Sequence, residues 1–151
     1  MQVEEFFRES YSISTDSARL DISVIHNFLN TSYWSEDIPF AIVSKAIENS
    51  LCFGVYNGNK QIGFARVISD FTTFGYLADV FIIEEERGYG LSKWLMECIL
   101  KHQQLQGLRN ICLMTRDAHS LYERFGFKNI PNPENFMAIK KDDFYKKKSN
   151  E

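Results

Sequence analysis

Apolar and polar residues follow two different periods along the first part of the chain. Residues 11–16 alternate in character and predict a short strand. From Asp21, a candidate helix N-cap, apolar residues return every three or four positions on one helical face. The loop 33–39 ends at a proline, and residues 40–50 predict a second short helix. The chain is therefore expected to begin with one strand and two helices.

The next part of the pattern predicts an antiparallel meander. Three apolar runs lie between turn signals, and the Asn57-Gly58 pair is the strongest signal because it favours a tight hairpin. The last of these runs, YLADVFII, is interrupted by a single acid, Asp79. The expected strands are 51–56, 60–69 and 76–83, with a second turn at 71–75.

The second half of the chain alternates helix and strand. A long apolar stripe begins at Leu91, and Gly107 is expected to close that helix. Asp117 is a candidate N-cap for a later short helix, with Gly126 just past its end. The remaining expected elements are a strand at 109–114, a last strand at 136–141 and a flexible tail at about 142–151. This order predicts a mixed α/β sheet, with an antiparallel meander ahead of a crossover unit.

Composition narrows the class of protein. With 151 residues, 44% of them apolar, the chain is expected to form a single domain over 1–151 with a real core. A net charge of −3 argues against nucleic acid as a partner. No leader pattern or membrane-span length is present, so a cytoplasmic protein that binds no membrane is expected. The three cysteines and three histidines show no ligand spacing, which predicts buried thiols and no metal.

The stretch EEERGYGLSKWLMECIL, residues 84–100, places two glycines directly before the longest helix. Glycines at a helix N-terminus allow an anion to reach unpaired backbone N–H groups. A P-loop needs GxxxxGK followed by Ser or Thr, which the stretch lacks. A dinucleotide fingerprint needs a third glycine where this chain has Lys93. The pattern favours a phosphate-binding turn of another kind.

Three segments together resemble the GNAT superfamily of N-acetyltransferases. RGYGLS, residues 87–92, is similar to the loop that binds the acyl-CoA pyrophosphate, although Ser92 stands where the family prefers Gly or Ala. ADVFIIEEERGYG is similar to the family's central strand running into that loop, and AHSLYERFGF, residues 118–127, to its late helix. The resemblance implies a mixed, mostly antiparallel central sheet flanked by helices on both faces.

The resemblance also implies how acetyl-CoA is bound as the co-substrate. Loop backbone N–H groups would hold the pyrophosphate, and main-chain groups of the preceding strand would align with the pantetheine arm and offer an oxyanion donor. Thr115 stands where many relatives carry Asn against the pantetheine. The expected cofactor-binding residues are Val80, Phe81, Ile82, Arg87, Gly88, Tyr89, Gly90, Leu91, Ser92 and Thr115.

Catalytic roles are expected for Tyr122 and Asp79. The resemblance implies that Tyr122 is the general acid for the leaving thiolate, while its other reading is a half-buried tyrosine of an amphipathic helix. Asp79 is either a general base for the acceptor ammonium or half of a structural ion pair. Tyr33 and Trp34 lie in a loop similar to the family's acceptor wall. Asp70 either binds a cationic acceptor or forms hydrogen bonds that stabilise the turn in which it lies.

The resulting expectation is an N-acetyltransferase that moves an acetyl group from acetyl-CoA to a primary amine, by direct attack without a covalent intermediate. The acceptor is expected to be a small molecule, and a homodimer is possible. Two alternatives remain open: a non-catalytic acyl-CoA sensor, and an enzyme that acetylates proteins. A closed aromatic pocket near Trp34 would count against the second.

Overall fold

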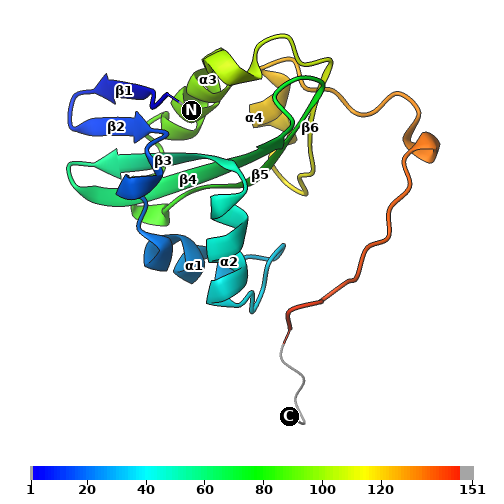
Figure 1. Ribbon diagram of the computed structural model, residues 1–151, viewed down its shortest axis with the longest axis horizontal. Helices are drawn as coiled ribbons and strands as arrows, with labels where there is room; N and C mark the ends of the chain where they lie inside the picture. The colour runs from blue at the N-terminus through cyan, green and yellow to red at the C-terminus, as the bar shows by residue number, and fades with distance from the viewer. Residues whose placement is uncertain (1, 147–151) are drawn as a thin grey trace.

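A six-stranded mixed sheet organises the protein, in a computed structural model that describes residues 2–146. The strands lie side by side in chain order (Figure 1). Strands β1 to β5 are antiparallel to their neighbours, and β6 runs parallel to β5. The strands are β1 (Glu5–Arg8), β2 (Tyr11–Ser14), β3 (Leu51–Asn57), β4 (Lys60–Ser69), β5 (Phe74–Ile82) and β6 (Asn110–Leu113). The expected mixed, mostly antiparallel sheet is confirmed.

Helices cover both faces of this sheet, as expected. Helices α1 (Ile22–Asn30) and α2 (Phe40–Glu48) pack on one face, and α3 (Leu91–Lys101) and α4 (His119–Glu123) on the other. Short 3-10 turns occur at Ser17–Arg19, Glu84–Glu86, Gln103–Leu105 and Pro133–Asn135. The N-cap at Asp21 is confirmed, since its carboxylate accepts a hydrogen bond from the Val24 N–H at 3.3 Å.

Each face of the sheet has its own hydrophobic core. On the α3 side, Phe53, Leu95 and Ile99 are among the fully or nearly fully buried side chains. On the α1–α2 side, Ile25 and Phe64 are fully buried. Alternate side chains of β3, β4 and β5 feed the two cores, because successive residues of a strand point to opposite faces.

The sheet opens between β5 and β6. Their parallel pairing starts at Phe74–Asn110 and ends at Leu77–Leu113, although β5 itself continues to Ile82. The second half of β5 is therefore paired with β4 on one edge and has no β6 partner on the other. This opening lies directly before the turn that leads into α3.

Several sequence-based boundaries were wrong. Strand β1 was not expected, because Phe6 is its only half-buried side chain and no apolar period marks it. Helix α3 ends at Lys101 rather than at Gly107, because His102 leaves helical geometry with ψ 132° and its ring accepts a hydrogen bond from the Gln104 N–H. Helix α4 is capped at Ala118 rather than Asp117, and without a side-chain cap.

The C-terminal part also differs from the expectation. Residues 136–141 form no strand within the described chain, because no neighbouring backbone pairs with them there. Within the expected flexible tail, Tyr145 packs against the α1–α2 core and Lys146 pairs with Glu36 at 3.4 Å, and the flexibility of the tail stays a prediction. Residues 147–151 of that tail lie outside the described residues.

Candidate active site

The glycine turn before α3 adopts a backbone conformation that other residues rarely take. Gly88 has φ 90° and Gly90 has φ 75°, both in the left-handed region. A Cβ at either position would meet nothing within 4 Å, so neither glycine makes room for packing. Gly90 is the N-cap of α3 and has no side chain to accept from the first amides of the helix. The turn therefore presents unpaired N–H groups toward open space.

Charged side chains around this turn are held in place. The Arg87 Nε donates to the Ile82 carbonyl oxygen at 3.0 Å, which ties the loop to the end of β5. The Glu86 carboxylate accepts from the Tyr11 hydroxyl at 3.0 Å and from the Asn57 side-chain amide at 3.1 Å. Glu86, one of the three acids before the turn, is therefore held by hydrogen bonds to β2 and β3.

The free edge of β5 continues toward this turn. Val80, Phe81 and Ile82 follow the last β5–β6 pair, and Phe81 and Ile82 are paired with β4 on their other edge. The Ile82 carbonyl is already engaged by Arg87. An extended chain could add to such an edge by main-chain hydrogen bonds.

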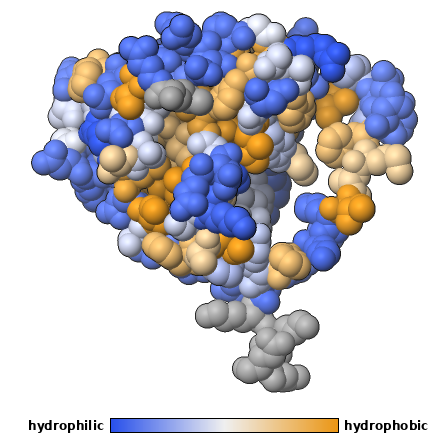
Figure 2. Space-filling view, viewed as in Figure 1, coloured by the Kyte–Doolittle hydropathy of each residue, from blue (hydrophilic) through white to orange (hydrophobic). Residues whose placement is uncertain are grey.

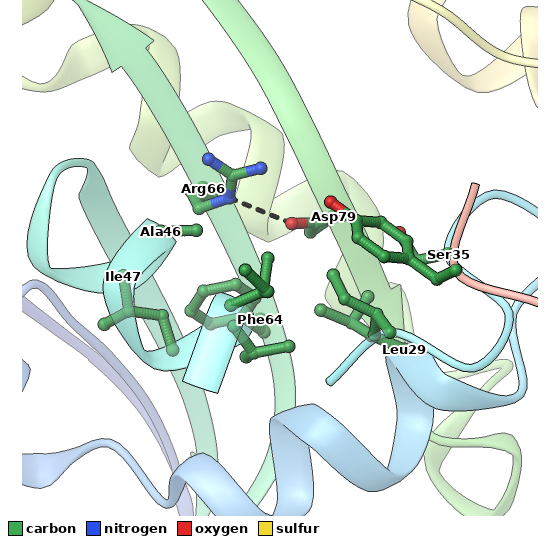
Figure 3. A pocket seen from close by; sticks show the side chains of 11 residues that line it. Leu29, Ser35, Ala46, Ile47, Phe64, Arg66 and Asp79 are labelled. Carbon is green, nitrogen blue, oxygen red and sulfur yellow. Dashed lines mark hydrogen bonds and ion pairs between the residues drawn. The ribbon is translucent and has the colours of Figure 1, made fainter. Parts of the chain in front are cut away.

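A β-bulge sets the direction of the Asp79 side chain. Between the register pairs Arg66–Ala78 and Phe64–Phe81, β5 carries one residue more than β4, and Asp79 has φ 56° there. The Asp79 carboxylate accepts from the Arg66 Nε at 2.9 Å (Figure 3). Its other oxygen accepts from the Trp34 indole at 2.9 Å. Asp79 is therefore one partner of a half-buried ion pair, in which the Arg66 side chain is 16% exposed and the Asp79 side chain 11% exposed.

This ion pair lies in the wall of a pocket between α1, α2 and the sheet. The pocket has a volume of about 160 Å³ and its other walls are mostly apolar (Figure 3). Tyr145 closes part of it from the C-terminal segment. The lining residues are Leu29, Ser35, Ile38, Ile42, Val43, Ala46, Ile47, Phe64, Arg66, Asp79 and Tyr145.

Tyr122 lies on the opposite side of the sheet opening, within the α3 core. Its side chain is 8% exposed and packs edge-to-face against Phe127. Burial, with smaller contributions from Tyr33 and Asp117, raises the pKa of the Tyr122 phenol to about 12. The hydroxyl is therefore protonated at neutral pH and can donate a hydrogen bond.

The loop between α1 and α2 connects the two sides of the opening. The Tyr33 hydroxyl accepts from the Arg116 N–H at 3.3 Å, and the Arg116 guanidinium lies 3.7 Å from the centre of the Tyr33 ring. Tyr33 also packs edge-to-face on Trp34, which bonds Asp79. The Thr115 hydroxyl accepts from the Ala118 N–H at 3.0 Å, so it also supports the start of α4.

Asp70 is separate from this constellation. Its carboxylate accepts from the amides of Thr72, Thr73 and Phe74 and from the Thr73 hydroxyl. These bonds, the hydroxyl first, hold the pKa of Asp70 well below its usual range. The geometry therefore favours a role for Asp70 in stabilising its own turn.

Arg66 was not predicted from the sequence as a site residue. A single arginine in one apolar strand, opposite a single acid in the next strand, was a signal that could have identified it.

Two further features bear on the sequence expectations. Among residues 2–146, no group of three or more His, Cys, Asp or Glu side chains is arranged to hold a metal ion. No helix in that part of the chain is long and apolar enough to cross a membrane. The absence of a metal and the cytoplasmic location stay predictions.

A mixed sheet open between β5 and β6, a glycine turn before α3 and helices on both faces define the class of fold. The family profile described as "Acetyltransferase (GNAT) domain" matches residues 48–129. The chain therefore belongs to the GNAT family of acetyltransferases, as its sequence motifs predicted.

Individual relatives agree with this assignment. The chain is 32% identical over 150 residues to a "putative acetyltransferase" of Gibberella zeae, covering 83% of this chain and 84% of that protein. A crystal structure from Xanthomonas campestris, described in the same words and as a GNAT family member, is 46% identical with a TM-score of 0.89. The match covers 91% of this chain and 97% of the Xanthomonas chain. A GNAT family acetyltransferase of Elizabethkingia anophelis, solved with acetyl-CoA bound, shares the fold at 13% identity. The TM-score of this match is 0.62, and the match covers 80% of this chain and 78% of the Elizabethkingia chain.

Proposed function

We propose that the protein transfers an acetyl group from acetyl-CoA to the primary amine of a small molecule by direct attack. The observation that carries the proposal is the meeting of three features at one opening of the sheet. These are the glycine turn before α3, the unpaired edge of β5, and the Asp79 and Tyr122 side chains on its two sides. The family assignment supports acetyl-CoA as the donor.

The donor would be held mainly by the backbone. N–H groups of the loop and first helical turn, at Gly88, Tyr89, Gly90, Leu91 and Ser92, would bind the pyrophosphate, aided by the helix dipole. The Arg87 N–H, also expected there, already donates to the Glu84 carbonyl oxygen at 3.2 Å. The fit is good, because the space that a Cβ would occupy at Gly88 and Gly90 is open. Main-chain groups of β5 at Val80, Phe81 and Ile82, with Thr115 across the opening, would align the pantetheine arm.

Transfer would begin when the neutral acceptor nitrogen attacks the thioester carbonyl carbon. A β5 N–H would stabilise the resulting oxyanion, and collapse of the intermediate breaks the C–S bond. Asp79, directly or through a water, would take the proton that the nitrogen loses. Asp79 is already held by Arg66 and Trp34, but an ionised carboxylate has about four acceptor sites and can still bind an ammonium proton.

Tyr122 would act on the leaving sulfur. Because the pKa of Tyr122 is raised to about 12 and that of a free thiol is about 8.5, full proton transfer to the thiolate is unfavourable by roughly three to four pKa units. A hydrogen bond from the hydroxyl to the developing thiolate is the more favourable role. Such a bond to a charged atom contributes about 1.5–3 kcal/mol. The thiolate then takes its proton from solvent.

The acceptor is proposed to be small because the pocket beside Asp79 is small. A volume of about 160 Å³, lined by apolar side chains and partly closed by Tyr145, leaves little room for a folded protein surface. Trp34 and Tyr33 would form the wall nearest the thioester. A small acceptor is therefore proposed in preference to a protein acceptor.

Calorimetry with acetyl-CoA, followed by a panel of small primary amines assayed for CoA release, tests the proposal. Binding at micromolar concentration and turnover with at least one amine are expected. Tyr122→Phe should lower kcat by about 10- to 150-fold, the loss of one hydrogen bond to a charged atom, with little change in acetyl-CoA affinity. Tight acetyl-CoA binding without turnover on any amine would instead support the sensor alternative.

A further inference from the structure

Arg66 keeps unused hydrogen-bond donors beside the acceptor pocket. Its Nε donates to the Asp79 carboxylate, and one of its terminal nitrogens donates to the Ser50 hydroxyl at 3.1 Å. A guanidinium carries five N–H donors, and the other donors of Arg66 form no hydrogen bond with residues 2–146. Figure 3 shows both terminal nitrogens directed away from Phe64 and the apolar part of the pocket. The guanidinium can therefore bind an anionic group there.

The direction of these donors is fixed from two sides. The Ser50 hydroxyl donates its own proton to the Ala46 carbonyl oxygen at 2.7 Å, so it receives Arg66 with a lone pair. Asp79 holds the Nε of the same planar group at 2.9 Å. A planar fork held at two of its nitrogens presents its remaining N–H groups in a set direction. Ser50 is thus a positioning residue for Arg66.

A second hollow adjoins the acceptor pocket at Arg66. It is an open groove of about 310 Å³ between α2 and β4, and it shares Ile42, Ala46 and Arg66 with the pocket. Lys45 adds a second cation to its wall, and no acid lines the groove within the described part of the chain. The whole chain carries a net charge of −3, so these two cations are a local departure from its charge. Such a wall attracts an anion.

The acceptor pocket itself suits an apolar group. Its volume is about 160 Å³, and Leu29, Val43, Ile47 and Phe64 are among its walls. A cavity of about 150 Å³ with walls of this kind binds benzene, so a side chain as large as that of leucine or phenylalanine fits. Figure 2 shows hydrophobic and hydrophilic residues side by side on the surface over α2. An apolar space, an acid and a cationic groove therefore meet along α2.

We propose that the acceptor is an α-amino acid with an apolar side chain. Its amine faces Asp79, its carboxylate binds the terminal N–H groups of Arg66 near Lys45, and its side chain enters the pocket beside Phe64. The amine and carboxylate of such a molecule flank a single carbon. They therefore match the Asp79–Arg66 pair, whose facing atoms are 2.9 Å apart, with opposite charges in the same order. This inference rests on the proposed function and names its substrate class.

A carboxylate fits this place better than a phosphate dianion. Asp79 offsets one of the two cations, which leaves roughly a single positive charge for the ligand. The planar carboxylate also matches the planar fork of a guanidinium. Transfer forms the C–N bond to the α-nitrogen, breaks the C–S bond, and gives the N-acetyl amino acid, the CoA thiol and one proton from the ammonium.

Turnover of L-leucine against L-leucinamide measures the carboxylate site. After correction for the fraction of neutral amine, kcat/KM for the acid should be about 10- to 150-fold higher, the contribution of one hydrogen bond to a charged group. Arg66→Lys keeps a cation for Asp79 but loses the fork, so this acid-to-amide ratio should fall at least about tenfold. A general loss of activity cancels in the ratio. Equal rates for the acid and the amide, or an unchanged ratio in Arg66→Lys, overturn the proposal.

The groove is tested with a pair of exposed lysines. Lys45→Met should lower the acid-to-amide ratio by roughly 1.5- to 5-fold, because solvent screens an exposed cation. Lys101→Met is the matched control: each lysine is the basic residue in the last turn of its helix, but Lys101 lies on α3, across the sheet. This control should leave the ratio unchanged. Equal ratios in the two variants would remove the carboxylate from the groove and overturn the proposal.

Two analogues test the other parts of the acceptor. Glycine leaves the apolar pocket empty and should be at least about tenfold poorer than L-leucine, the contribution of burying its side chain. The aminophosphonate analogue of leucine carries a second negative charge and should also be poorer. Equal turnover of glycine and leucine, or a preference for the phosphonate, contradicts the proposed class of acceptor.

Calorimetry with the products separates a failure of this inference from a failure of the proposed function. With CoA present, N-acetyl-L-leucine should bind about 10- to 150-fold more tightly than N-acetyl-L-leucinamide, and neither has an ionising amine. Tighter binding of the acid without turnover of any amine would refute the transfer but support the carboxylate site. Turnover of neutral amines with equal binding of the two products would overturn the carboxylate site and leave the transfer standing.

Discussion

Replacing Gly90 with alanine separates the backbone role of this glycine from its proposed binding role. Gly90 has φ 75°, a conformation that costs an L-residue roughly 1–2 kcal/mol. A Cβ there meets nothing within 4 Å, so no steric clash adds to this cost. For a chain of this length, about 1–2 kcal/mol corresponds to a melting temperature lower by roughly 2–8 °C.

Gly107 is the matched control for this change. It has φ 79°, and a Cβ there also meets nothing within 4 Å. It follows the 3-10 turn at the far end of α3, so it is remote from the loop that precedes the helix. Gly107→Ala should therefore lower the melting temperature by a similar amount for the same conformational reason.

The two variants should differ in acetyl-CoA binding. A methyl group at residue 90 stands in the open space before the first amides of α3 and would keep a phosphate oxygen from one of them. The loss of one hydrogen bond to a charged atom is about 1.5–3 kcal/mol, or roughly 10- to 150-fold in affinity. Calorimetry at a temperature where both variants are folded measures this difference. Equal affinities in the two variants would refute the assignment of the turn as the pyrophosphate site.

Three further changes test other parts of the site and fold. Arg66→Met leaves the half-buried Asp79 without its cation and should lower stability by about 2 kcal/mol, seen as a melting temperature lower by roughly 4–8 °C; a shift below about 1 °C would contradict the ion pair. Burial lowers the pKa of His102, so the unfolded chain takes up a proton first and stability should fall as pH drops below about 6.5. His102→Gln should lose that slope below about pH 6.5 in urea titrations, and an unchanged slope would show that another group causes it. Asp70→Ala should lower the melting temperature while leaving the acceptor KM unchanged, whereas a raised KM would restore Asp70 to the acceptor site.

Local signals in the sequence were sufficient for most of the fold. The helical stripe after Leu91 and the glycines before it define α3 and its turn, since both depend on residues a few positions apart. The end of that helix was not predictable in the same way. His102 stops α3 by capping Gln104 with its ring, and the other nitrogen of its buried imidazole lies 2.9 Å from the Glu4 carboxylate of the N-terminal segment. The second contact joins residues far apart in sequence.

The candidate site shows the same division. Tyr122 and the glycine turn belong to short motifs that can be read one segment at a time. The environment of Asp79 could not be predicted from one segment. It depends on a bulge in β5, a guanidinium from β4 and an indole from the α1–α2 loop. The sequence left the base and ion-pair readings of Asp79 equal. The structure supplies the ion pair, and the base role stays a prediction.

The bulge is also the reason that Asp79 can face an acceptor at all. In a regular strand, residue 79 would share a face with Leu77, which is buried in the α3 core. The extra residue turns Asp79 to the α1–α2 face instead, beside Arg66, while Tyr122 stays on the α3 side. A thioester lying in the opening between β5 and β6 would then have the hydrogen-bond donor for its sulfur on one side of the sheet and the proton acceptor on the other. A one-residue deletion at position 80 should return the carboxylate to the α3 side and abolish transfer. The unchanged glycine turn should still bind acetyl-CoA, although more weakly because the Val80 main-chain contacts to the pantetheine arm are lost.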